Sequence, residues 1–143
     1  MTTLSSAAKL DALRRCDVFA RIPAAALGVL AEILETESLR VGDALFERGE
    51  PSDRVYVVVS GRLRVLVPGR AEPVRSLGPG QLLGEYGLFA AGARTASVRA
   101  DEASVLLSLG YARFRAFLHQ FPEAMFVLLG TAVGRLLEAE RSS

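Results

Sequence analysis

The sequence predicts a mainly β, α+β fold: an antiparallel β-roll, like a double-stranded jelly roll, with helices on both sides of it. Near both ends of the chain, apolar residues recur at the spacing of a helix. Between them, over residues 36–109, short apolar segments alternate with glycine-bearing turns, about every 8 to 12 residues. Short strands at such regular intervals are typical of a β-sandwich or roll.

The N-terminal region, about residues 7–35, is expected to be helical. Leu10 and Leu13 lie one helical turn apart, and Pro23 suits the first position of a further helix because its φ angle is already helical. An apolar stripe follows Pro23 at helical spacing and consists of Leu27, Leu30, Ala31 and Leu34. We interpret this stripe as core packing.

The roll itself is expected over about residues 36–109. Its turns are predicted at residues 41–43, 49–53, 60–62, 68–70 and 77–80. Residues 62–67 alternate in character, as a strand does when one of its faces is solvated. Leu63, Val65 and Val67 share the apolar face, and Arg62 and Arg64 share the solvated one. A further strand is expected at residues 104–109, and a short helix at residues 86–89.

Two helices are expected after the roll, over about residues 111–140. The first has one apolar side, formed by Phe114, Phe117, Leu118 and Phe121. Pro122 begins the second, which carries Met125, Phe126, Leu129, Val133, Leu136 and Leu137. Because no internal repeat interrupts this order, residues 1–143 are predicted to form a single domain.

Composition narrows the functional class. A net charge of +1, with both signs interspersed, predicts no nucleic-acid partner. Cys16 is the only cysteine, which excludes an internal disulfide and a cysteine-based zinc site. No apolar run is long enough to span a bilayer, and the chain does not open on an export signal. A soluble, cytoplasmic protein that does not bind a membrane by itself is therefore expected.

Catalytic motifs are missing from the sequence. His119 is the only histidine, so it cannot supply the ligand cluster of a cupin-like metalloenzyme. A nucleophile elbow, G-x-S-x-G, and a Walker motif are also missing. We therefore expect no enzyme activity, no metal and no cofactor.

Residues 84–98, GEYGLFAAGARTASV, combine groups suited to one phosphate and one sugar hydroxyl. Gly84 permits close approach of the backbone to a ligand, and the first amides of the short helix favour an anion. Arg94 adds a guanidinium fork that matches phosphate oxygens. Glu85, which only accepts hydrogen bonds when ionised, suits a ribose 2′-OH.

This stretch resembles the phosphate-binding cassette of cyclic nucleotide-binding domains. The matching residues are GEYGL at 84–88 and RTA at 94–96, and residues 94–101 are especially similar to hyperpolarisation-activated cyclic nucleotide-gated channels. The resemblance covers about residues 10–138. Tyr86 departs from the usual Leu or Ile, and Ala93 from the frequent Pro or Arg.

The resemblance implies ligand-binding roles for Gly84, Glu85, Tyr86, Gly87, Arg94, Thr95, Val67, Leu77, Leu83 and Arg135. The cassette and its short phosphate-binding helix would hold phosphate and ribose, while the Thr95 hydroxyl would reach the phosphate or a purine edge. Val67 and Leu77 would line the base. Arg135, on the last helix, would cover the base, with Ala139 near an aliphatic cap.

The expected function is a cyclic nucleotide sensor whose last helix moves when ligand binds. We expect cAMP to be favoured over cGMP, because residues 94–101 resemble channels that prefer cAMP. A non-catalytic structural or interaction module with a degenerate pocket, or a cyclic dinucleotide sensor, is the alternative. Related transcription regulators carry a helix-turn-helix after this helix, and the sequence contains no basic recognition helix there. An effector domain, a partner protein and a homo-oligomer all stay open.

Overall fold

The computed structural model describes residues 3–90 and 92–142, so Met1, Thr2, Ala91 and Ser143 of the expected domain lie outside the described residues. The N-terminal helices are α1 (Ser6–Arg14), α2 (Asp17–Ala20) and α3 (Ala24–Ile33). The strands are β1 (Glu35–Leu39), β2 (Ala44–Phe46), β3 (Arg54–Ser60), β4 (Leu63–Leu66), β5 (Arg75–Leu77), β6 (Leu82–Leu83), β7 (Ser97–Ala100) and β8 (Ser104–Gly110). Helix α4 (Tyr86–Phe89) lies between β6 and β7, and α5 (Tyr111–Gln120) and α6 (Pro122–Ser142) follow the strands.

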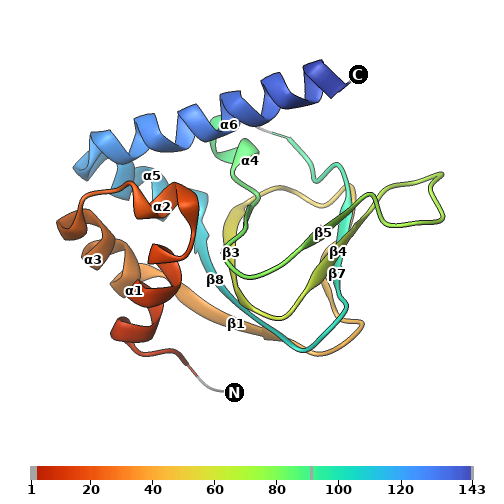
Figure 1. Ribbon diagram of the computed structural model, residues 1–143, viewed down its shortest axis with the longest axis horizontal. Helices are drawn as coiled ribbons and strands as arrows, with labels where there is room; N and C mark the ends of the chain where they lie inside the picture. The colour runs from red at the N-terminus through yellow and green to blue at the C-terminus, as the bar shows by residue number, and fades with distance from the viewer. Residues whose placement is uncertain (1–2, 91, 143) are drawn as a thin grey trace.

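Within the described residues, the strands form two antiparallel sheets of four. Their orders are β1-β8-β3-β6 and β2-β7-β4-β5, and together they make the roll (Figure 1). The predicted antiparallel β-roll with flanking helices is therefore confirmed. An apolar cluster fills the inside of the roll and consists of Tyr56, Val58, Leu63, Leu77, Leu83, Val98, Ala100 and Leu106.

A second apolar cluster joins the roll to the helices. Side chains alternate between the two faces of a strand, so Val55 and Val57 of β3 face the helices whereas Tyr56 and Val58 face the roll. The helical side of this cluster includes Leu13 of α1, Leu30 of α3, Phe114 of α5 and Leu128 of α6. Strand β3 thus separates the two cores, which fixes the helices relative to the inside of the roll.

The N-terminal region differs in detail from the sequence prediction. It contains a separate short helix, α2, which buries Val18 and Phe19. Pro23 caps α3 from the position before its first residue, with ψ at 145°, and does not occupy the first helical position. The predicted apolar stripe of α3 is buried, as expected, at Leu27, Leu30, Ala31 and Leu34.

Helix α6 runs from beside α5 across α4 (Figure 1). Among its described residues, three are buried against the rest of the domain, and two of these are small: Ala124, Leu128 and Ala132. Its larger apolar residues are mostly exposed, including Phe126, Val133, Leu136 and Leu137. No helix in the part of the chain that the structure describes has the length and apolar character needed to cross a membrane.

Candidate functional site

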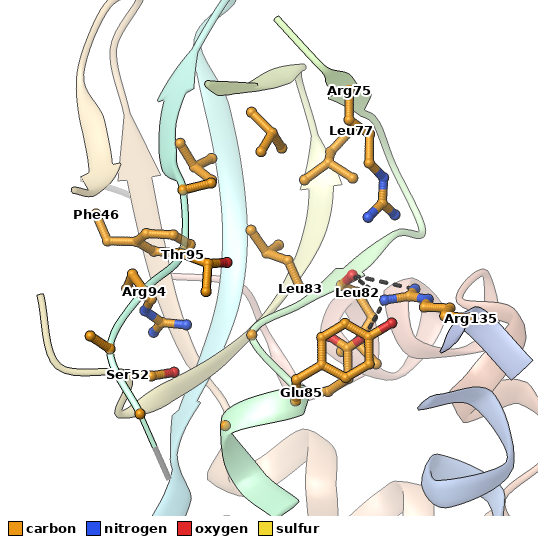
Figure 2. Close-up of a pocket in the computed structure, with 18 of the residues that line it drawn as sticks. Phe46, Ser52, Arg75, Leu77, Leu82, Leu83, Glu85, Arg94, Thr95 and Arg135 are labelled. Atoms are coloured by element: carbon orange, nitrogen blue, oxygen red, sulfur yellow. Dashed lines mark hydrogen bonds and ion pairs between the residues drawn. The ribbon is translucent and has the colours of Figure 1, made fainter. Parts of the chain in front are cut away.

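A cavity of about 540 Å³ opens at the end of the roll where α4 and α6 meet it (Figure 2). Its walls come from β2, β4, β5, β6 and β7, from residues 84–87, 90 and 92–96, from Ser52 and from one residue of α6, Arg135. Eight of the sequence-predicted site residues line it: Leu77, Leu83, Gly84, Glu85, Tyr86, Gly87, Arg94 and Thr95, and Arg135 makes a ninth. Residues that are far apart in the chain are therefore brought to one place.

Gly84 makes the turn that leads into α4. Its φ angle is +88°, and a Cβ at this position would lie 2.5 Å from the carbonyl oxygen of Arg54 and 3.0 Å from Nη1 of Arg94. Both the conformation and the space therefore require glycine. The turn brings Tyr86 and Gly87 to the cavity wall, where the first amides of α4 have no acceptor within the helix.

Gly87 is required for a different reason, because two side chains occupy the space beside it. A Cβ on Gly87 would overlap the hydroxyl groups of Tyr111 and Ser52. The Tyr111 hydroxyl lies 2.6 Å from Oγ of Ser52 and donates to the carbonyl oxygen of Gly84 at 2.5 Å. The first residue of α5 thereby ties the cassette to the turn before β3. The sequence did not identify Ser52 or Tyr111, since nothing local links two positions 59 residues apart.

Backbone hydrogen bonds hold the loop that carries Arg94 against the turn at residues 49–53. The amide of Gly49 donates to the carbonyl oxygen of Arg94 at 2.9 Å, and the amide of Arg94 donates to that of Glu50 at 2.8 Å. The amide of Ser52 also donates to the carbonyl oxygen of Gly92, at 3.2 Å. These bonds fix the position of Arg94 before any ligand is present.

The side chain of Arg94 is buried, with 7% of the residue exposed. Its Nη2 donates to the carbonyl oxygen of Arg54 at 3.1 Å, and its guanidinium carbon lies 4.1 Å from the centre of the Phe46 ring. The nearest carboxylate, on the exposed side chain of Asp53, is 3.7 Å away. Nε of Arg94 is buried without a hydrogen-bond partner among the described residues. A buried cation with an unused donor suits an anionic ligand.

Glu85 is 1% exposed and pairs with Nη1 of Arg135, which also lies 3.4 Å from the carbonyl oxygen of Leu82. Figure 2 shows Arg135 reaching from α6 to these two groups. Burial raises the pKa of Glu85 above its ordinary value, and the charge of Arg135 lowers it by a smaller amount. The structure thus places Arg135 on the carboxylate assigned to the ribose, a partner that the sequence did not reveal.

The remaining wall of the cavity is mostly apolar. Leu77 and Leu83 are buried there, and Val65 is half-buried. Val67 does not line the cavity, because β4 ends at Leu66 and the chain then turns away. Val65, two residues earlier on the same face, takes that place. Ala139 of α6 is exposed and is not part of the cavity wall.

The outer face of the roll carries the other arginines that the sequence singled out. Arg64 pairs with Asp101, and Nη1 of Arg62 donates to Oγ of Ser76 at 3.1 Å. Neither lines the cavity. Among the described residues, no group of three or more His, Cys, Asp or Glu side chains could hold a metal ion.

A family model described as cyclic nucleotide-binding domain matches residues 36–121. A CRP-like cAMP-activated global transcriptional regulator of Mycobacterium tuberculosis is 27% identical over 129 residues, which are 88% of this chain and 58% of the regulator. A cyclic nucleotide-gated potassium channel of Mesorhizobium japonicum is 32% identical over 118 residues, which are 82% of this chain and 32% of the channel. The chain thus spans less than two thirds of either relative.

Two solved structures are also similar. The N-terminal domain of a transcriptional regulator from Streptomyces coelicolor A3(2) is 34% identical, with a TM-score of 0.77, and the match covers 93% of this chain and 94% of that one. The regulatory domain of Toxoplasma gondii PKA, crystallised with cAMP, is 25% identical, with a TM-score of 0.70 over 78% of this chain and 44% of that one.

Proposed function

The chain belongs to the family of cyclic nucleotide-binding domains, and on that premise we propose that it is a cAMP sensor whose ligand occupies the cavity of the roll. The buried Arg94 side chain, with its unpartnered Nε, is the observation that carries this proposal. A cyclic phosphate would meet Arg94, the Thr95 hydroxyl and the first amides of α4, at Tyr86 and Gly87. Arg94 would neutralise its charge, and the hydroxyl and the amides would donate hydrogen bonds to its oxygens.

The ribose and the base follow from the position of the phosphate. Glu85 lies next along the cavity wall and would accept a hydrogen bond from the 2′-OH. The base would then lie between Val65, Leu77 and Leu83, whose side chains provide an apolar surface. One ligand of a phosphate, a sugar and a flat base therefore fits the sequence of groups along the cavity.

The preference for cAMP over cGMP rests on the relatives and on the cassette. One relative is named as cAMP-activated, and one similar structure was crystallised with cAMP. Residues 94–101 also resemble channels that prefer cAMP. Thr95 is compatible with both nucleotides, so it does not decide between them.

Movement of α6 would follow from the pair between Glu85 and Arg135. A ribose hydroxyl at Glu85 must share the carboxylate with Arg135 or displace it, since both need its lone pairs. Ligand binding and docking of α6 would therefore share a coupling free energy, which acts equally in both directions. Through α6, the domain would signal to an effector segment or a partner.

Calorimetry with cAMP on the full chain tests the proposal. Arg94→Ala should weaken binding by roughly 2–5 kcal/mol, the cost of truncating one member of a buried charge-assisted contact. Arg113→Ala is the matched control, because Arg113 is exposed on α5 and pairs only loosely with Glu35, at 3.7 Å. Its affinity should match that of the wild type. If folded Arg94→Ala binds cAMP as tightly as the wild type, the phosphate does not lie at Arg94 and the proposal is wrong.

A further inference from the structure

A second cavity, of about 500 Å³, adjoins the one proposed for the nucleotide and differs from it in charge. Arg94 and Phe46 line both cavities and so lie between them; in Figure 2 both are on the side of the nucleotide cavity opposite Arg135. The second cavity is lined by four carboxylates and two guanidinium groups, an excess of two negative charges: Glu35, Glu37, Glu50 and Asp53, and Arg54 and Arg94.

Strand β1 directs two of these carboxylates into the roll. Side chains alternate between the faces of a strand, so Glu35, Glu37 and Leu39 share one face of β1. Leu39 packs against the apolar cluster inside the roll, and Tyr56 of β3 belongs to that cluster. Glu35 and Tyr56 also lie opposite the same residue of β8, Ser108, in the register of their sheet. The two carboxylates and the tyrosine therefore lie on the inner face of one sheet.

Glu37 and Tyr56 have polar groups without a partner. Glu37 is half-buried and forms neither a hydrogen bond nor an ion pair within the part of the chain that the structure describes. Tyr56 is 6% exposed and lines the cavity, and among the same residues its hydroxyl has no hydrogen-bond partner. Burial, with smaller contributions from the charges of Glu37 and Asp53, raises the pKa of Tyr56 to about 12. A hydroxyl on a buried side chain normally has a partner, and a donor from a ligand would supply the missing one.

The other three carboxylates differ in how firmly the protein holds them. Oε2 of Glu35 lies 3.5 Å from Nη1 of Arg54, and Oε1 of Glu50 accepts a hydrogen bond from a backbone amide at 2.6 Å. Asp53 is exposed, and its Oδ1 lies 3.7 Å from the nearest guanidinium nitrogen. The negative charge that is free to meet a ligand is therefore mainly at Glu37 and Asp53.

These groups suit an organic cation. An ammonium group donates three hydrogen bonds and accepts none, so it matches a carboxylate and a hydroxyl oxygen. A metal ion does not fit, because the described His, Cys, Asp and Glu side chains form no group of three that could hold one. Leu45 and Phe46 also line the cavity and offer apolar surface to an alkyl chain. Because Glu37 and Asp53 come from separate elements, a chain with an ammonium group at each end matches both.

We propose that the second cavity is a binding site for linear aliphatic polyamines. One ammonium group binds Glu37 and the Tyr56 hydroxyl, a second binds Asp53, and the chain between them lies on Leu45 and Phe46. Binding at this site does not require a nucleotide.

Arg94 couples this site to the nucleotide site, a part of the inference that rests on the proposed function. An ammonium group at Asp53 takes that carboxylate from Arg94, so the guanidinium is freer to bind a phosphate. A phosphate at Arg94 in turn neutralises the charge that repels the ammonium group. Both effects have the same sign. Polyamine and cAMP therefore strengthen each other's binding, by the same factor in each direction.

Calorimetry on the full chain without nucleotide tests the site with putrescine and with Mg²⁺, which carry the same charge. Putrescine should bind more tightly, because a diffuse negative potential attracts both ions but only the diamine matches the positions of the acceptors. Glu37→Gln keeps the shape of the side chain and should weaken putrescine by about tenfold or more, as the loss of a hydrogen bond to a charged group does. Tyr56→Phe keeps the ring in the core and should weaken it by about threefold or more.

Glu72→Gln is the matched control, since Glu72 is exposed in the loop between β4 and β5 and the change removes the same charge. It should alter the affinity for putrescine by less than about twofold. A wild type that does not bind putrescine, or that binds Mg²⁺ as tightly, would overturn the site. Equal weakening in Glu37→Gln and Glu72→Gln would overturn it as well, because net charge alone would then explain the binding. Tyr56→Phe leaves every charge unchanged, so an unaltered affinity in this variant would contradict the assigned contact.

The coupling is measured as the affinity for cAMP with and without saturating putrescine, with Mg²⁺ at the same concentration as the control for screening. Putrescine should strengthen cAMP binding by about fivefold or more in the wild type, the lower end of typical couplings, and have no effect in Glu37→Gln at a concentration that does not saturate this variant. If cAMP binds equally well with and without bound putrescine, the coupling through Arg94 is wrong. A chain that binds putrescine but no cyclic nucleotide would instead overturn the proposed function and leave the polyamine site standing.

Discussion

Removing Arg135 should destabilise the unliganded chain by an amount that depends strongly on pH. Glu85 is 1% exposed and Arg135 is its cationic partner, so Arg135→Ala leaves a buried carboxylate without compensation. Breaking such a pair typically costs about 3–5 kcal/mol. The protein can limit this cost by protonating Glu85, and the price of protonation depends on how far the pH lies above the ordinary pKa.

The ordinary pKa of a glutamate side chain and the pH set the size of that limit. From an ordinary pKa of 4.5 for this carboxyl group, protonation costs about 3.4 kcal/mol at pH 7 and about 0.7 kcal/mol at pH 5. Arg135 lowers the pKa of Glu85, so its removal raises that pKa further above the value in the unfolded chain. The penalty is therefore present above the folded-state pKa and disappears as the pH falls toward 4.5.

Urea denaturation of four proteins measures this coupling: the wild type, Arg135→Ala, Glu85→Gln and the double variant. In the Glu85→Gln background, Arg135→Ala removes only some packing and the contact with the Leu82 carbonyl, which together contribute about 1 kcal/mol. In the Glu85 background the loss should reach about 3 kcal/mol at pH 7 and fall to about 1 kcal/mol at pH 5. Equal losses in both backgrounds, or no change with pH, would refute the reasoning.

Three further outcomes are expected. The 2′-deoxy analogue of cAMP should bind the wild type more weakly than cAMP does, by about 1.5–3 kcal/mol, and Glu85→Gln should lose most of this difference. Calorimetry with both ligands tests this, and equal affinities in the wild type would show that Glu85 does not contact the ribose. Gly87→Ala should lower the free energy of unfolding by about 1–3 kcal/mol because of overlap with Tyr111, whereas Gly92→Ala, with open space around it, should change it by less than about 0.5 kcal/mol. Hydrogen exchange should show that cAMP protects residues 130–140 in the wild type but not in Arg135→Ala, and protection that persists would place the responsive segment elsewhere.

Elements with local signals could be predicted closely from the sequence. Helices α4 and α5 have the predicted bounds, because their apolar spacing and flanking residues act within one or two turns. The cassette could also be predicted from the sequence, since Gly84, Glu85 and Arg94 lie within eleven residues of one another and their order is distinctive. Gly84 adopts a positive φ angle, which glycine favours because it has no Cβ, so the residue type alone indicates the turn.

Features that depend on pairing across the chain could not be predicted. The alternation of residues 62–67 predicts the correct inward face of β4, but not the point where the strand ends. The resemblance implies a base-lining role for Val67, whereas Val65 lines the cavity. The partner of Arg135 is 50 residues away on another element, and only the docking of α6 brings it to Glu85. The exposure of Phe126 could not be predicted either, because helical spacing does not show which side of α6 packs against the rest of the domain.

Because Nε of Arg94 has no hydrogen-bond partner among the described residues, the melting temperature of the chain should depend on how much of it has bound ligand. Among the described residues Nε of Arg94 is buried without a hydrogen-bond partner, and leaving such a donor unpaired typically costs about 1–3 kcal/mol. An anion at this position removes the cost and adds its own binding free energy, which grows with the logarithm of ligand concentration. The melting temperature of the chain, followed in a cell lysate, would therefore report how much ligand surrounds it. Selection of variants for thermal stability alone would therefore favour replacement of Arg94, although the dependence of the melting temperature on ligand requires this residue.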